Sequence, residues 1–92
     1  MEFEADFWWD SKFSGLKFAG SIHGKRYVFA ISRTALVDFF QTADTVEQAI
    51  ENFEQNRPRF ESMVERFVLG ERLPHDDGPV VVTLLRCIEY QL

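Results

Sequence analysis

The residues with the most evident chemical potential are His75, Asp76 and Asp77, which follow one another in a polar segment. They could ligate a metal ion or transfer protons. A zinc site, however, needs three or four ligands at fixed geometry, and the only other nitrogen or sulfur donors are the distant His23 and Cys87. We therefore interpret 75–77 as a solvated loop. The alternative is that the protein is a small ligand- or metal-binding protein, or an enzyme, that uses the His75-Asp76-Asp77 loop.

Cys87 is the single cysteine, so no disulfide can form within the chain. A nucleophilic cysteine needs a nearby cation, histidine or helix N-terminus to lower the pKa of its thiol. Arg86 is adjacent but would point to the opposite face of a strand, so we expect Cys87 to be a small buried side chain. The sequence also lacks a glycine-rich phosphate loop, a G-x-S-x-G elbow and paired catalytic carboxylates. These observations favour a non-enzymatic protein without a metal or cofactor.

Two groups of side chains are candidates for binding a partner. Arg57 and Arg59 could hold an anion or an acidic segment, although an intrahelical pair of Arg57 with Glu61 is the simpler use. Trp8 and Trp9 lie among acidic residues. Such aromatic residues belong to the core and its rim when buried, and are typical of a protein contact when exposed.

Composition restricts the class of protein. The 92 residues, 46% hydrophobic and 27% charged, fit a single domain over 1–92. A net charge of −5 opposes nucleic-acid binding, which needs a basic surface. The longest uncharged apolar run, Val80 to Leu85, is far too short for a membrane span, and no export signal opens the sequence. We therefore expect a cytoplasmic protein that binds neither nucleic acid nor membranes.

Alternation of apolar and polar residues predicts strands in the first third of the chain. Odd-numbered residues of 1–9 are apolar, and even-numbered ones are acidic except Trp8. The alternation resumes over 16–22 and 25–31, around a turn at His23-Gly24 or Gly24-Lys25 that would close a hairpin. Either turn places Leu16, Phe18 and Ile22 on one face with Tyr27, Phe29 and Ile31.

Capping signals and helical spacing predict two helices in the middle of the chain. Ser32 can cap a short helix from Arg33 to about Phe40. Thr45 and Gln48 fit a capping box before a second helix. Its apolar stripe stays in phase across Pro58, which favours one kinked helix from Val46 to about Leu69. Two helices, with Asn56 as a new N-cap, remain the alternative.

A run of β-branched residues predicts a final strand from Val80 to Tyr90, apolar on both sides. The expected order is β-β-β-α-α-β. We therefore predict an α+β fold with a mainly antiparallel sheet of about four strands and two helices packed on one sheet face.

Several short motifs resemble those of one protein family, and they are spread over nearly the whole chain. They are Trp9-Asp10, Lys17-Phe18, Gly24, Ile31-Ser32 before Ala35-Leu36, Phe53 with Asn56-Arg57, and Gly78. The sequence resembles the bacterial proteins of the domain of unknown function 1488 (DUF1488) family. The resemblance implies a compact α+β fold of a sheet and two helices in a small bacterial cytoplasmic protein. It implies no activity and no catalytic residue.

One helical layer can cover only one face of the predicted sheet. The other face would then carry exposed apolar residues, which is unusual for a surface left entirely to water. We predict that this face meets another copy of the chain or a different protein, with a two-fold homodimer as the default. The function favoured by the sequence is a non-enzymatic protein-binding or adaptor module. The predicted partner face consists of Ala19, Val28, Ala30, Val81 and Leu85.

Overall fold

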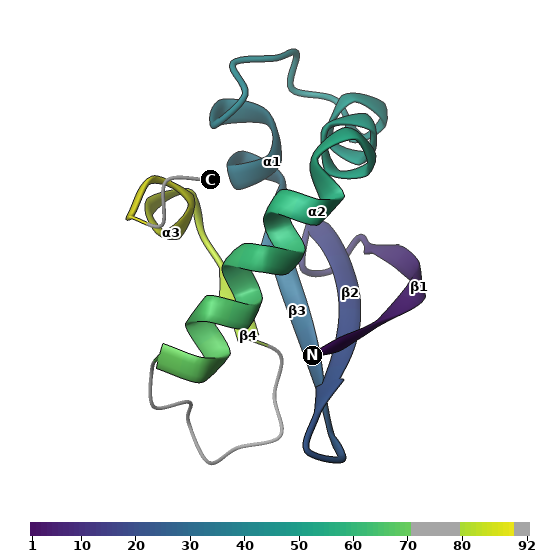
Figure 1. The fold of residues 1–92 in the computed structure, drawn as a ribbon. Helices are drawn as coiled ribbons and strands as arrows, with labels where there is room; N and C mark the ends of the chain where they lie inside the picture. Colours follow the sequence, from purple (N-terminus) through teal and green to yellow (C-terminus); the bar gives the residue numbers. More distant parts are fainter. Residues whose placement is uncertain (71–79, 90–92) are drawn as a thin grey trace.

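The computed structural model describes residues 1–70 and 80–89 of the chain. Figure 1 shows the helices gathered on one side of a twisted sheet. The elements are β1 (Glu2–Asp10), β2 (Gly15–Ile22), β3 (Lys25–Ser32), α1 (Arg33–Asp38), α2 (Val46–Gly70), β4 (Val80–Val82) and α3 (Leu84–Glu89). The α+β class and the mainly antiparallel four-stranded sheet predicted from the sequence are confirmed, with three helices in place of two.

The sheet has the strand order β1-β2-β3-β4, and only the β3–β4 pair is parallel. The β2–β3 hairpin closes at His23 and Gly24, whose φ angles of 52° and 79° both lie in the left-handed region. Two consecutive positive φ angles are typical of the type I′ turn, whose twist matches that of the strands. The resulting register pairs Phe18 with Phe29, which confirms the shared apolar face.

β1 contains an irregularity in its pairing with β2. Phe3 lies opposite Gly20 and Phe7 lies opposite Phe18, so the three β1 residues 4–6 face the single β2 residue Ala19. In this stretch β1 has two more residues than β2. Because side chains alternate between the two sheet faces, an even difference keeps both Phe3 and Phe7 on the core face. Gly20 leaves room for the Phe3 ring, because a Cβ at this position would lie 2.9 Å from Cδ1 of Phe3 and the ring would have to shift.

α2 is one continuous helix across Pro58, as the phase of its apolar stripe predicts. Its ribbon changes direction midway in Figure 1, and a proline inside a helix is a common cause of such a bend. The buried residues Phe53 and Phe60 lie on either side of the proline. The ring of Phe53 packs on Phe18 of the sheet at 5.2 Å between centroids, so α2 covers the Phe18 face.

The strand predicted from Val80 to Tyr90 is confirmed only at its start and is wrong from Leu84 to Glu89. Only Val80–Val82 form a strand, and Leu84–Glu89 form α3. β4 pairs with β3 up to Ile31, one residue before β3 ends at Ser32, so the sheet offers almost no partner beyond Val82. Thr83 then starts the helix, since its Oγ1 accepts a hydrogen bond from the Arg86 amide at 3.3 Å. Tyr90 lies outside the described residues.

Candidate functional site

The sheet face that points away from α2, here called the open face, is less apolar than the sequence suggests. One cross-strand row on it runs Trp8, Lys17, Ala30, Val81 over all four strands. Ala19 and Ala30 are fully buried and Val28 is half-buried, so these three predicted partner-face residues add little exposed surface. The exposed apolar groups of the row are at its ends, where Trp8 is 40% and Val81 43% exposed.

Two ion pairs flank the alanines of the open face. Lys17 Nζ lies 2.8 Å from Asp10 Oδ2, and the Arg26 guanidinium donates to both carboxylate oxygens of Glu4, at 2.6 and 3.1 Å. The hydrogen bond from Lys17 lowers the pKa of Asp10, and that from Arg26 lowers the pKa of Glu4. These charges stay solvated, so the centre of the open face is a weak candidate for a dry interface.

The β4–α3 end, defined as Val81, Leu85 and Ile88, is a stronger candidate surface. Leu85 was predicted on the sheet but lies on α3, where it is 62% exposed, and Ile88 is 57% exposed. The two side chains share the outward side of α3 because they are three residues apart. Cys87 on the same helix is fully buried and Leu84 packs against the core. α3 is therefore amphipathic, with its outer side uncovered by the described residues.

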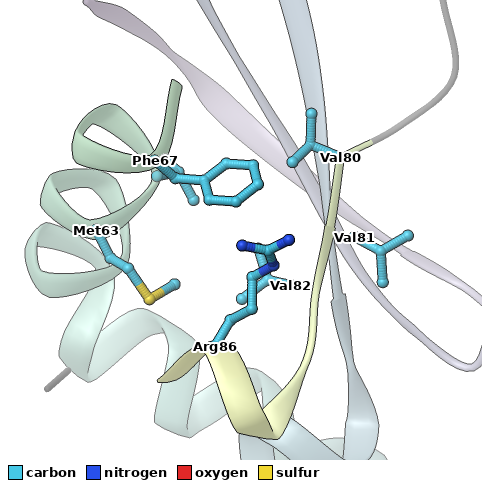
Figure 2. Close-up of a pocket in the computed structure, with 7 residues that line it drawn as sticks. Met63, Phe67, Val80, Val81, Val82 and Arg86 are labelled. Carbon is cyan, nitrogen blue, oxygen red and sulfur yellow. The ribbon is translucent and has the colours of Figure 1, made fainter. Parts of the chain in front are cut away.

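A hollow lies between α2 and β4, and Figure 2 shows Arg86 reaching into it from α3. The Arg86 guanidinium stands 4.1 Å from the centre of the Phe67 ring, a cation–π contact. The hollow encloses about 10 Å³, which is room for about one water molecule and none for an organic ligand. It is lined by Met63, Val64, Phe67, Val80, Val81, Val82 and Arg86.

Arg57, a binding candidate from the sequence, is engaged inside the fold. Its Nη1 donates to the Ala5 carbonyl at 2.7 Å, and its Nη2 donates to the Glu4 carbonyl. Its Nε donates to Glu61 at 3.1 Å, the pair expected from the sequence. Arg57 thus satisfies carbonyl groups in the irregular part of β1, and the arrangement is structural.

Arg59 and the two tryptophans also point in different directions. Arg59 donates to the Asn56 side chain at 3.0 Å and lies 6.0 Å from the Phe40 ring, away from the β1 contacts of Arg57. The two arginines therefore do not converge on a common anion. Trp9 is half-buried against the core, whereas Trp8 is on the open face. Adjacent strand residues point to opposite faces, so the pair does not form one aromatic patch.

The described residues contain no cluster of three or more side chains suited to hold a metal ion. His75, Asp76 and Asp77 lie outside the part of the chain that the structure describes. Burial raises the pKa of the Cys87 thiol to about 11, so the thiolate is scarce at neutral pH. The expectation that Cys87 is a small buried side chain is confirmed.

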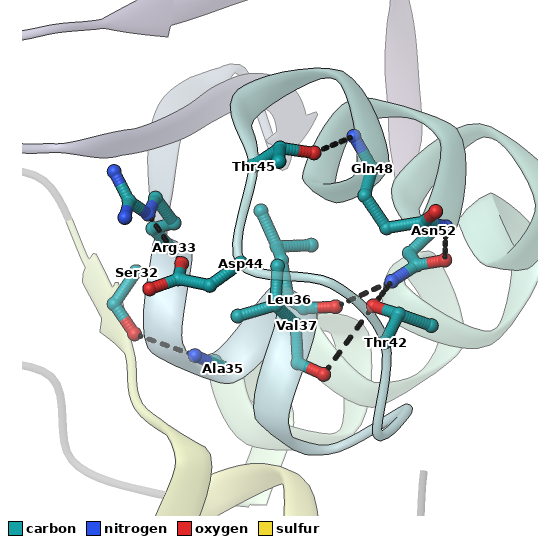
Figure 3. A network of polar contacts seen from close by, with 10 residues as sticks. All are labelled: Ser32, Arg33, Ala35, Leu36, Val37, Thr42, Asp44, Thr45, Gln48 and Asn52. Atoms are coloured by element: carbon teal, nitrogen blue, oxygen red, sulfur yellow. Dashed lines mark hydrogen bonds and ion pairs between the residues drawn. The ribbon is translucent and has the colours of Figure 1, made fainter.

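Asn52 is a structural centre that the sequence analysis missed. It is the buried polar residue of α2, and Figure 3 shows its side chain between α1, the α1–α2 loop and its own helix. Its Nδ2 donates to the Leu36 carbonyl at 2.9 Å and to Thr42 Oγ1 at 2.8 Å. Gln48 donates to Asn52 Oδ1 at 2.9 Å, and the predicted capping box is not closed, because the Thr45 amide donates to the Ala43 carbonyl at 3.0 Å. The Thr45 half of that box is present, because Thr45 Oγ1 accepts from the Gln48 amide at 3.1 Å.

The comparisons with known proteins agree with this fold. A crystal structure of a DUF1488-family protein of unknown function from Shewanella loihica PV-4 superposes with a TM-score of 0.74. The match is 24% identical and covers 88% of this chain and 89% of that chain, which supports the fold. No curated protein matches the chain. None of the described helices is long and apolar enough to cross a membrane. The family model described as protein of unknown function (DUF1488) matches residues 1–82, and the chain therefore belongs to the DUF1488 family.

Proposed function

We propose that this protein is a non-enzymatic protein-binding module that acts as a homodimer through its β4–α3 end. The observation that carries the proposal is the exposure of Val81, Leu85 and Ile88 on two consecutive elements. Exposed aliphatic side chains on a small domain are candidates for a contact surface. A bacterial cytoplasmic setting is part of the proposal, and the free thiol of Cys87 supports it.

The charge distribution favours a second copy as the partner. The whole chain has a net charge of −5, so two copies repel each other at most approaches. Residues 80–89 contain one cation, Arg86, and one anion, Glu89, so this end is locally neutral. A two-fold contact here brings together surfaces without net like charge.

The hollow beside β4 is too small to be a small-molecule site. At about 10 Å³ it is far below the several hundred Å³ of a typical ligand pocket. Cys87 is not available as a nucleophile, since it is buried and its thiol pKa is raised to about 11. A role in binding is therefore better supported than a role in catalysis.

Sedimentation equilibrium from low to high micromolar concentration tests the proposal. We expect the wild-type chain to be a dimer in this range, and the Leu85→Glu, Ile88→Glu double variant to be a monomer, because the charges would be desolvated at the contact. Leu69→Glu is a matched control, since Leu69 is 63% exposed but lies at the end of α2 outside the β4–α3 end. It should remain dimeric. A wild-type chain that is monomeric at every concentration contradicts the proposal.

A further inference from the structure

β1 contributes no buried residue to the fold. None of its nine residues is buried, whereas five of the eight residues of β2 are. Within the described residues β1 pairs with β2 alone, and the irregularity at residues 4–6 interrupts that pairing. Segments with few buried contacts and exposed backbone hydrogen bonds are those that open locally in folded proteins. β1 therefore belongs to the low-stability end of this fold.

The rest of the domain has a core of its own. Phe18 packs on Phe29 at 5.4 Å and on Phe53 at 5.2 Å between ring centroids. Phe53 in turn packs on Phe60 at 5.7 Å. These four rings come from β2, β3 and α2, and all are fully buried. β1 adds half-buried aromatic side chains at the margin of this core, so its separation would leave the four-ring contacts in place.

Arg57 joins β1 to α2 at the point where the strand pairing is interrupted. Its two terminal nitrogens donate to the backbone carbonyls of Glu4 and Ala5. Its guanidinium lies 5.9 Å from the centre of the Phe7 ring of β1. Glu61, one turn further along α2, accepts from its Nε at 3.1 Å and holds the group in this position. The planar fork of an arginine suits two acceptors at once, and lysine cannot reproduce it.

We infer that β1 is a strap that opens from the rest of the domain as one unit, and that Arg57 is the latch that holds it closed. Opening breaks the two carbonyl contacts of Arg57 and the ion pair of Arg26 with Glu4. It also uncovers the edge of β2 and separates the Phe7 ring from Phe53, on which it packs at 5.2 Å. The inference goes beyond the proposed function, since it concerns the sheet edge opposite the β4–α3 end.

Native-state hydrogen exchange, measured by NMR on the full chain in low urea at one protein concentration, tests the strap. The probes are the protected amides of residues 7–10 in β1 and of residues 29–31 in β3. Relative to their intrinsic rates, the β1 amides should exchange at least about tenfold faster than the β3 amides. Their exchange should also depend less steeply on urea, because opening exposes less surface than global unfolding does. Equal protection and equal urea dependence in the two groups would overturn the inference.

Val37→Ala separates opening from global unfolding in a second way. Val37 is buried in α1, which lies apart from β1 in Figure 1. Its truncation therefore weakens the closed and the open states alike, and leaves the equilibrium between them unchanged. We expect the amides of 29–31 to exchange at least about fivefold faster, and those of 7–10 to keep their rates. An equal acceleration of both groups would mean that β1 separates only when the whole domain unfolds.

Arg57→Lys tests the latch, and Arg59→Lys is its matched control. Lysine keeps the positive charge but loses the fork on the two carbonyls. We expect the amides of 7–10 to exchange at least about tenfold faster in Arg57→Lys. In Arg59→Lys they should stay within about twofold of the wild-type rates, because Arg59 donates to the Asn56 side chain on its own helix. Equal rates in the two variants would overturn the assignment of Arg57 as the latch.

Discussion

Asn52 joins α1, the following loop and α2 through hydrogen bonds that an apolar residue could not make. Replacement by alanine leaves the Leu36 carbonyl without its side-chain donor and removes a partner of Thr42. Because Asn52 is buried, we expect Asn52→Ala to lower the free energy of unfolding by about 1–3 kcal/mol. Urea denaturation measures this change. Gln55→Ala, an exposed site on the same helix, should change it by less than about 0.5 kcal/mol, and an equal loss in both variants would contradict a special role of Asn52.

Asp10 gives the fold a dependence on acid pH. Its hydrogen bond with Lys17 lowers the pKa of the folded carboxyl below the ordinary value of 3.8. The unfolded chain therefore binds the proton more readily, so the stabilisation is complete above 3.8 and is lost as the pH falls through the lowered value. We expect the wild-type chain to have a higher free energy of unfolding than Asp10→Asn at neutral pH, as measured by urea denaturation. This difference in free energy should vanish in strong acid. An advantage that persists below the folded pKa would show that another feature of Asp10 is responsible.

The change from strand to helix at Thr83 decides how the chain leaves the sheet. Thr83 Oγ1 accepts from the Arg86 amide, and the Thr83 carbonyl accepts from the Cys87 amide at 3.1 Å. Thr83→Ala removes the first of these bonds, and we expect a loss of about 0.5–2 kcal/mol in thermal or urea unfolding. Ser62→Ala, at an exposed site inside α2, removes a hydroxyl without removing a cap and should be close to neutral. Equal effects of the two changes would argue against Thr83 as the helix cap.

Local patterns predict most of the elements but not their context. The alternation over 16–31 predicts a hairpin, and the in-phase apolar stripe across Pro58 predicts one continuous helix. Both patterns depend only on neighbours along the chain, and both predictions are confirmed. α3 was missed because it follows the β-branched run 80–83, and the strand pattern was extended through it. The reason for the helix is that β3 has almost no positions left to pair. The irregularity in β1 was missed for a similar reason, since it depends on Arg57 from a distant helix.

The candidate site was harder to predict than the fold. Arg57 is identified correctly as a residue with strong hydrogen-bonding capacity, but its donors are taken up by β1 and Glu61. Ala19 and Ala30 were assigned to the correct sheet face by register, yet alanine side chains are short and are fully buried there. Exposure depends on the sizes of all neighbouring side chains, and the sequence pattern records only the face to which a residue points.

Molecular size connects the proposed association to stability. A domain of 92 residues buries a modest fraction of its surface, so a dimer contact would add an appreciable part of the total free energy. If folding and association are linked, each tenfold rise in protein concentration adds about 1.4 kcal/mol per dimer to the free energy of unfolding. We expect the thermal midpoint of the wild-type chain to rise with concentration, as measured by circular dichroism.

The same scans on two variants assign that rise to a surface. The Leu85→Glu, Ile88→Glu variant should unfold at a midpoint independent of concentration, because it removes the contact while α3 keeps its buried side, where Cys87 packs in the core. Leu69→Glu introduces a charge at a site of similar exposure and should keep the wild-type dependence. A midpoint that rises equally in all three chains would place the contact elsewhere on the molecule. A midpoint that is constant in all three would mean that the fold is stable without a partner, as expected when the core of α2 and the sheet alone determines stability.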